Sequence, residues 1–383
     1  MSTCRPRFEV HKAQKIAAAL LLIFLLQSLW LLAHLPLDMA ESRDALAGKS
    51  LWTFGKLSNS RSPLIPGDSI LALRCAGLLP SVLASSETGR REFNIYAAPS
   101  RWLVRLPFLV FGVWLGAALW WVARRIFGDE GAYIALALYC LSPAMLLASA
   151  TVDSAILAAW GLFGLVFTAI GVAHTLYAPW KKWRPRVLLL GLAIGLTAAA
   201  SVSAALAGLL LAGAFMLYLA PGRRLASVAI LGSSSIIGAL VFFACFGFSA
   251  RDIAAAGVIP DLTRLKMAPH FRHILLSIPG GLLEIIAFLS CLLVFIAWRR
   301  THYFGNFAPL VVTVLLLWWP TDSFAGSATV WVLPFAFVFV GGIYADLLEP
   351  QFLRGRFRKH VVAAAIVLIG ASTVLSFVLM AGA

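Results

Sequence analysis

The sequence predicts an all-α, polytopic integral membrane protein with about eleven transmembrane helices. Of its 383 residues, 61% are apolar and only 12% are charged, whereas a soluble domain has about 45–50% apolar and about 25% charged residues. Apolar runs of about 20 residues alternate with short basic clusters, and about 20 helical residues span the hydrocarbon core of a bilayer. The few charged residues cannot cover a soluble core, so the apolar runs are predicted to cross a membrane.

The basic residues of the chain lie near the ends of these apolar runs. The formal net charge is +15, but Lys and Arg collect in short loops and form no continuous basic face. This distribution is typical of membrane proteins rather than of nucleic-acid binding, so we expect no nucleic-acid partner. The cysteines form no CxxC pair and predict neither a metal nor a redox site; they are Cys4, Cys75, Cys140, Cys245 and Cys291.

The apolar runs also predict the topology. They lie at 16–35, 103–122, 131–150, 154–177, 187–202, 203–219, 225–248, 274–298, 304–319, 330–348 and 361–380. The first run is too long for a signal peptide and lacks a small-residue cleavage site, so we expect an uncleaved first span. A cytoplasmic N-terminus places the basic clusters inside, as the positive-inside rule requires. The C-terminus is then extracytoplasmic, and the expected location is a bacterial cytoplasmic (inner) membrane.

The run at 187–219 allows two topologies. Its 33 residues are too many for one upright helix and too few for two full ones. We expect a shallow hairpin that turns near Ser201–Ser203. A single tilted helix is the alternative, but it would invert the rest of the chain and place the later basic clusters outside.

Two extracytoplasmic loops are long enough to hold a functional site. Loop 36–101 belongs to a predicted first transmembrane module, 1–220, and its stretch Ile70–Leu83 is apolar enough to form a short interfacial helix. Loop 249–273 belongs to the C-terminal transmembrane helices, 221–383, and we expect no separate soluble domain. This second loop is basic and contains histidines, a composition that can bind a lipid phosphate. Its candidate residues are Arg264, Lys266, His270, Arg272 and His273.

Carboxylates at the predicted outer surface are the candidates for chemistry. Asp38, Glu41 and Asp44 recur every three residues, which places them on one face if this segment is helical. Like charges so close repel unless a cation or a proton separates them, and such clusters often mark sites. The alternative is the solvated start of a loop. Asp153, which follows the helix-breaking Pro143, is either a second functional carboxylate or the N-cap of the helix that begins at Ser154.

Glu284 is a separate candidate inside the predicted span 274–298. It lies just after Pro279-Gly280-Gly281. An ionisable residue inside a membrane is costly and often functional. The alternative is a hydrogen-bonded structural contact.

The part of the chain from Arg105 to Asp153 resembles a known family. Its motifs are Arg105-Leu-Pro-Phe-Leu-Val-Phe-Gly112, Ala123-Arg-Arg-Ile-Phe-Gly128, Ala135-Leu-Ala-Leu-Tyr-Cys-Leu-Ser-Pro143 and Asp153. They resemble the membrane-embedded glycosyltransferases of the C superfamily, in particular family-39-like protein mannosyltransferases and the aminoarabinose transferase that acts on lipid A. The similar region runs from about residue 16 to residue 220.

This resemblance implies a function for the outer carboxylates. In the family, an acidic pair opens the first outer loop, and Glu41-Ser42 stands at its position here, followed by Ala47-Gly48 and Arg61-Ser62-Pro63-Leu64. Glu41 is then the expected catalytic base, with Asp38 and Asp44 as rivals, and Asp153 is expected to orient the acceptor or a metal. The donor would be a sugar on a polyprenyl phosphate, whose phosphate loop 264–273 would bind. The resemblance leaves a requirement for a divalent cation open, and no metal ligands are assigned.

The sequence also departs from the family pattern. Ser42 replaces half of the acidic pair, and Ala199-Ala200-Ser201-Val202 stands where relatives often have a lysine. The first hypothesis is therefore a glycosyltransferase that moves a sugar to a lipid, glycan or protein acceptor at the extracytoplasmic face. The second is an inactive lipid-binding or assembly subunit of an envelope complex. The third is a transporter or flippase, supported only by the number of spans and by Glu284.

Overall fold

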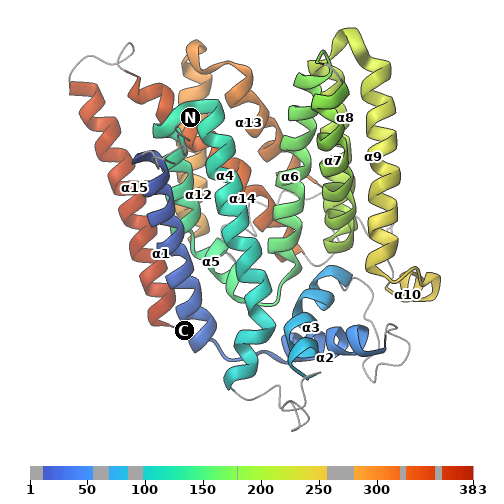
Figure 1. The fold of residues 1–383 in the computed structure, drawn as a ribbon. Helices are drawn as coiled ribbons and strands as arrows, with labels where there is room; N and C mark the ends of the chain where they lie inside the picture. Colours follow the sequence, from blue (N-terminus) through green and yellow to red (C-terminus); the bar gives the residue numbers. More distant parts are fainter. Residues whose placement is uncertain are drawn as a thin grey trace, which may run out of the picture.

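The computed structural model describes residues 12–54, 69–84, 98–178, 180–256, 280–319, 325–349 and 356–382. These ranges contain helices and no strand, and most of the helices run side by side in one bundle (Figure 1). The predicted all-α membrane fold is therefore confirmed. The helices are α1 (Lys12–His34), α2 (Met39–Phe54), α3 (Ile70–Ala84), α4 (Ala98–Leu141), α5 (Pro143–Ala150), α6 (Ser154–Thr175), α7 (Trp180–Ala200), α8 (Val202–Leu219), α9 (Arg224–Cys245), α10 (Ala250–Ala255), α12 (Gly281–Ala297), α13 (Phe304–Leu317), α14 (Ala325–Leu348) and α15 (Arg356–Ala381).

Helix α4 consists of two arms that meet at Gly128. This glycine has φ 77° and ψ −168°, a backbone conformation that residues with a side chain rarely adopt, and the helix is kinked there. The arms lie side by side (Figure 1), because the Tyr139 hydroxyl donates a hydrogen bond to the Gly112 carbonyl oxygen at 2.6 Å. The two predicted helices at 103–122 and 131–150 are confirmed as separate, but the second ends at Leu141 because Pro143 starts the new helix α5.

The predicted turn between α7 and α8 is also confirmed. Ser201 leaves the helical conformation with φ −160°, and its hydroxyl accepts a hydrogen bond from the Ala204 backbone N–H at 3.3 Å. The alternative of a single tilted helix is therefore wrong. Helix α7 begins at Trp180, so residues before the apolar run lengthen the first helix of the expected hairpin, and the depth of this hairpin in the membrane stays a prediction.

The lengths of the helices fit a membrane. Seven helices in the described ranges are long and apolar enough to cross a bilayer, with the two arms of α4 treated as one, and α3, α12 and α13 are shorter apolar helices. Outward-facing side chains on α9 are large and apolar, among them Leu225 at 88% and Ile236 at 66% exposure, as expected for contact with lipid. The count of eleven crossings stays a prediction.

Helices α2 and α3 lie across one end of the bundle (Figure 1), here called the α2–α3 end. Helices α1 and α15 also finish there, and α5 connects to α6 there. The two crossing helices touch backbone to backbone, since a Cβ atom on Gly48 would lie 1.9 Å from the Leu73 carbonyl oxygen and 2.8 Å from the Gly77 nitrogen. The predicted short helix at Ile70–Leu83 is confirmed as α3, and this packing fixes it on α2.

The hydrophobic core joins the two ends of the sequence. One cluster of buried side chains includes Phe24 of α1, Tyr139 of α4, Phe163 of α6 and Phe339 of α14. A smaller cluster around Leu165, on α6 to α9, lies beside it. The division of the chain at residue 220 stays a prediction.

Candidate functional site

Glu41 lies at the α2–α3 end, in the first turn of α2. Asp38 precedes the helix and accepts its first backbone bond, from the Ser42 N–H at 3.0 Å. Glu41 reaches back over this turn, and its Oε2 accepts a hydrogen bond from the Asp38 N–H at 3.0 Å. An acidic residue three positions after the helix start commonly caps a helix in this way, so the Asp38-x-x-Glu41 spacing positions Glu41 locally.

Arg105 in α4 binds the same carboxylate. Its Nε donates to Glu41 Oε1 at 3.0 Å, and its Nη2 donates to Oε2 in a short ion pair. Nη1 of Arg105 donates to the Leu35 carbonyl oxygen at 2.9 Å, and Nη2 donates a second bond to the Pro36 carbonyl oxygen at 2.8 Å, at the end of α1. Arg105 is 1% exposed, and a buried guanidinium requires such partners. The pair therefore joins α1, α2 and α4.

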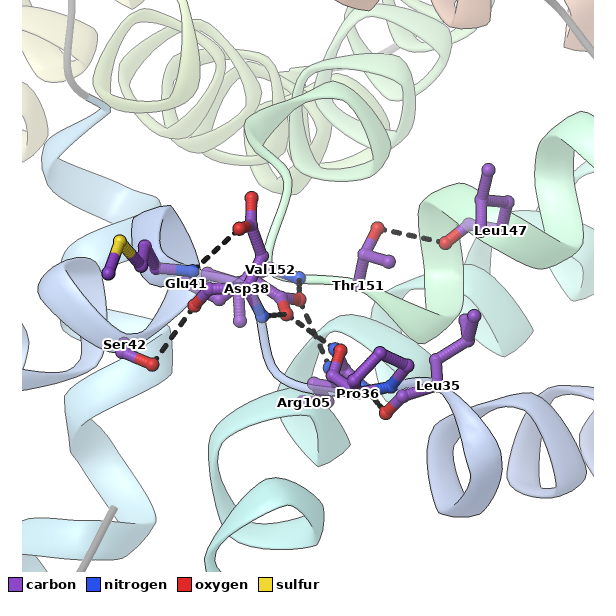
Figure 2. A network of polar contacts seen from close by, with 10 residues as sticks. Leu35, Pro36, Asp38, Glu41, Ser42, Arg105, Leu147, Thr151 and Val152 are labelled. Carbon is purple, nitrogen blue, oxygen red and sulfur yellow. Dashed lines mark hydrogen bonds and ion pairs between the residues drawn. The ribbon is translucent and has the colours of Figure 1, made fainter. Parts of the chain in front are cut away.

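The connection between α5 and α6 binds Glu41 as well. The Val152 backbone N–H donates to Glu41 Oε1 at 2.7 Å, as Figure 2 shows. Each carboxylate oxygen of Glu41 now accepts two hydrogen bonds, which fills the about four lone-pair sites that a carboxylate offers. Glu41 thus holds the segment that carries Asp153 against α2 and α4.

Asp153 follows Val152 directly and caps α6. Its Oδ1 accepts a hydrogen bond from the Ala155 N–H at 2.9 Å, so the predicted N-cap is confirmed. Burial raises the pKa of the Asp153 carboxyl group above its ordinary value, the bond from Ala155 opposes this shift, and the negative charge of Glu41 adds to it. Within the described ranges, Oδ2 of Asp153 forms no hydrogen bond. Asp153 therefore combines a fixed position with one open oxygen.

The other two predicted carboxylates, Asp38 and Asp44, make different contacts. Asp38 is exposed, and its Oδ1 accepts from the Met39 N–H at 2.6 Å (Figure 2). Asp44 forms an ion pair with its neighbour Arg43 at 2.8 Å. Asp38 precedes the helix, and Glu41 and Asp44 pair with different arginines, so a common role for the three carboxylates stays a prediction. Among the described residues, no three His, Cys, Asp or Glu side chains gather as a metal site would require.

Arg101 lies one helical turn before Arg105 on α4. Its side chain is half-buried, and its Nε is buried without a hydrogen-bond partner. In the described part of the chain no carboxylate forms an ion pair with it. The charge of Arg105 is balanced by Glu41, whereas the charge of Arg101 remains available to an anion at this end of the bundle.

Comparison with solved structures identifies the fold. The crystal structure of apo ArnT from Cupriavidus metallidurans is 14% identical, matches with a TM-score of 0.66, and covers 96% of this chain and 74% of ArnT. The structure of the same protein bound to undecaprenyl phosphate matches with the same TM-score at 13% identity. The Archaeoglobus fulgidus oligosaccharyltransferase matches with a TM-score of 0.54 at 13% identity, over 94% of this chain and about half, 53%, of that protein.

The chain has the fold of the C-superfamily membrane glycosyltransferases. No protein-family model and no curated protein sequence matches it. At this distance the shared property is the fold, so the C-superfamily resemblance that the sequence predicted is confirmed at that level.

Within the C-superfamily fold, the predicted site residues separate into three sets. Glu41 and Asp153 come together at the α2–α3 end, and Asp38 lies beside them, whereas Asp44 is bound to Arg43. The predicted phosphate-binding residues lie outside the described ranges; they are Arg264, Lys266, His270, Arg272 and His273.

Sequence reasoning missed the roles of Arg101 and Arg105. Arg105 was identified only as the start of a family-like motif, and Arg101 was not singled out. The signal for both was an arginine pair with i, i+4 spacing just before an apolar helix. Which arginine would bind the protein's own carboxylate required the structure, because Glu41 lies 64 positions away.

Proposed function

We propose that this protein transfers a sugar from a polyprenyl-phosphate-linked donor to a lipid, glycan or protein acceptor. The α2–α3 end would face the outside of a cytoplasmic membrane. The observation that carries this proposal is the Glu41 contact with Val152, because it places the Asp153 carboxylate at the end of the apolar helices. A donor with a lipid tail would keep its tail beside these helices and its sugar at their ends. ArnT in a related fold was crystallised with undecaprenyl phosphate, and AglB was solved with a dolichol-phosphate.

The geometry favours Asp153 over Glu41 as the general base. A base must approach the acceptor proton with an open lone pair, and the four hydrogen bonds of Glu41 leave it none. Asp153 has an open oxygen, and its raised pKa brings its basicity closer to that of a base that works near neutral pH. In this proposal Glu41 is a positioning residue, and the exposed Asp38 orients the acceptor or a cation.

The leaving lipid phosphate requires positive charge to stabilise it. Arg101 supplies an unbalanced guanidinium on the same helix face as Arg105. The residues of loop 264–273 would add to it, as the sequence predicted. In this arrangement Asp153 accepts the proton of the acceptor, and arginine stabilises the negative charge of the leaving phosphate.

A second candidate function is a non-catalytic, lipid-binding subunit of an envelope complex. The specific observation that favours it is again Glu41, since the carboxylate that matches the family's catalytic position is fully engaged in structural contacts. In that case Asp153 would serve only as the cap of α6. Lipid phosphate would still bind, but no sugar would be transferred.

The experiment that separates the two functions measures donor turnover. Purified protein in nanodiscs would be given radiolabelled polyprenyl-phosphate sugars and a crude envelope acceptor, and released polyprenyl phosphate and labelled acceptor would be counted. Transfer supports the first function. Binding of the donor without release of polyprenyl phosphate, across the donor panel, supports the second.

A further inference from the structure

Helix α5 links the end of α4 to the segment that carries Asp153, and glutamates from distant parts of the chain hold both of its ends. Beyond its C-terminal end, Glu41 Oε1 accepts a hydrogen bond from the Val152 backbone N–H at 2.7 Å. At its start, Glu284 Oε1 accepts a hydrogen bond from the Ser142 hydroxyl at 2.5 Å. Seven of the eight residues of α5 are buried, so neighbouring helices also enclose it.

The Ser142 hydroxyl makes two contacts at the start of α5. Its oxygen accepts a hydrogen bond from the Met145 backbone N–H at 3.4 Å and so caps the helix. A hydroxyl has one proton and two acceptor lone pairs. Because the proton is donated to Glu284, the lone pairs are left to accept from the first turn of α5. Glu284 therefore fixes the orientation of the capping hydroxyl.

A second contact joins the start of α12, the helix that carries Glu284, to the start of α5. Gly280 caps α12 with φ 78°, a backbone conformation that favours glycine. A Cβ atom at Gly280 would lie 3.2 Å from the ring of Pro143, the first residue of α5. The two segments are thus closely packed, and this packing and the Glu284 hydrogen bond together fix where α12 holds α5.

Hydrogen bonds continue from the end of α5 to Asp153. The Thr151 hydroxyl donates to the Leu147 carbonyl oxygen at 2.9 Å, which binds the residue after α5 to the helix. The Asp153 N–H donates to the Thr151 carbonyl oxygen at 3.0 Å. The eight residues of α5 span about 12 Å. A short, internally bonded segment therefore connects the position of Ser142 to that of Asp153.

We propose that Glu284 is a positioning residue for Asp153 and acts through Ser142 and α5. This inference rests on the proposed function, in which the Asp153 carboxylate accepts a proton from the acceptor. Glu41 and Glu284 hold the two ends of the segment, so the loss of Glu284 displaces the open oxygen of Asp153. A base must lie within hydrogen-bond reach of its proton, and a displacement of about 1 Å can lower a rate about 100-fold.

Transfer kinetics of the full-length protein in nanodiscs test this coupling. Glu284→Leu removes the acceptor of the Ser142 hydroxyl, whereas Glu284→Gln keeps an oxygen in its place. Well below the unfolding midpoint, kcat per folded molecule should fall about 10- to 100-fold in Glu284→Leu, with the donor KM unchanged, and should stay near the wild-type value in Glu284→Gln. A residue that serves only stability would lower the unfolding midpoint and leave kcat of the folded protein intact.

The Asp153→Asn background shows whether Glu284 acts through the base. Once the base is absent its position no longer matters, so adding Glu284→Leu should lower the residual transfer no further. A fall by the same factor in both backgrounds would overturn the proposal, and so would an unchanged kcat in folded Glu284→Leu. The matched control is Ser290→Ala, which removes a hydroxyl that bonds the Ala287 carbonyl oxygen within α12 and should leave kcat unchanged.

Hydrogen exchange tests the same coupling without a donor. In Glu284→Leu, or in Ser142→Ala if the first variant does not fold, a peptide covering residues 152–155 should exchange about tenfold faster, the effect of one lost hydrogen bond. Glu284→Gln and Ser290→Ala should exchange as the wild-type protein does. Unchanged exchange in the folded variants would overturn the positioning role. Absence of transfer by the wild-type protein would instead overturn the proposed function, and the exchange rates would still show whether Glu284 positions the Asp153 segment.

Discussion

Arg105 donates from Nε to Glu41 Oε1 at 3.0 Å, and the two side chains are 1% and 8% exposed. Removing one partner of a buried ion pair strongly destabilises a protein, because the remaining buried charge has no partner. The surrounding contacts show what the pair organises, since Arg105 also holds the end of α1 and Glu41 also holds Val152. The pair is therefore the structural centre of the α2–α3 end.

Removing either member of the pair should destabilise the protein by about 3–5 kcal/mol. Arg105→Met leaves the Glu41 charge buried and also releases the Leu35 and Pro36 carbonyl groups. Thermal unfolding, monitored by size-exclusion chromatography, would measure the loss of stability. The double variant Glu41→Leu/Arg105→Met should lose less than the sum of the single variants, and strict additivity would contradict the direct pairing.

The contact between α2 and α3 should tolerate no side chain at Gly48. A Cβ atom there would lie 1.9 Å from the Leu73 carbonyl oxygen, so Gly48→Ala must separate the helices and should cost about 1–3 kcal/mol. Gly164→Ala is the matched control, because nothing lies within 4 Å of a Cβ atom at that position. Unfolding midpoints of both variants test the prediction. Equal midpoints would show that α2 and α3 do not pack as described.

Arg101→Gln should weaken use of a lipid-phosphate donor. One charge-assisted hydrogen bond is worth about 1.5–3 kcal/mol, so KM should rise at least about tenfold while the protein stays folded. Arg125→Gln, which removes an exposed arginine beside Trp121 in the middle of α4, is the control. A KM that is unchanged in Arg101→Gln would assign the phosphate to other cations.

The pH dependence should follow Asp153. Its pKa is raised by burial and by Glu41, and a base works only when it is deprotonated. Turnover should therefore fall as the pH drops toward this raised pKa, at a higher pH than an exposed aspartate would give. A kcat/KM profile between about pH 4 and pH 8 measures this. An acidic limb at the ordinary pKa of aspartate would contradict the assignment.

The sequence predicted the fold well because membrane helices are encoded locally. About 20 apolar residues are enough to identify a span, and Pro143, Ser201 and Asp153 mark helix boundaries by their own chemistry. The start of α7 was misplaced because Trp180 and the basic residues after it are polar enough to look like a loop.

The site was harder to predict because its partners are distant in the chain. Spacing alone put Asp38, Glu41 and Asp44 on one face, and it could not show that Arg105 would neutralise Glu41 from 64 positions away. The same limit applied to Glu284, whose partner Ser142 lies 142 positions away. Local patterns identified which residues were unusual, and tertiary packing decided what they contact.

The most direct test of the central claim compares sugar transfer by Asp153→Asn and Asp44→Asn. Asn caps helices about as well as Asp, so Asp153→Asn should fold normally but lose the base and with it a factor of about 10²–10⁴ in transfer. Asp44→Asn, which neutralises the carboxylate paired with Arg43, should transfer at nearly the wild-type rate. Full transfer by a folded Asp153→Asn protein would contradict the claim that Asp153 is the base, and absence of transfer by the wild-type protein with every donor would favour the non-catalytic function.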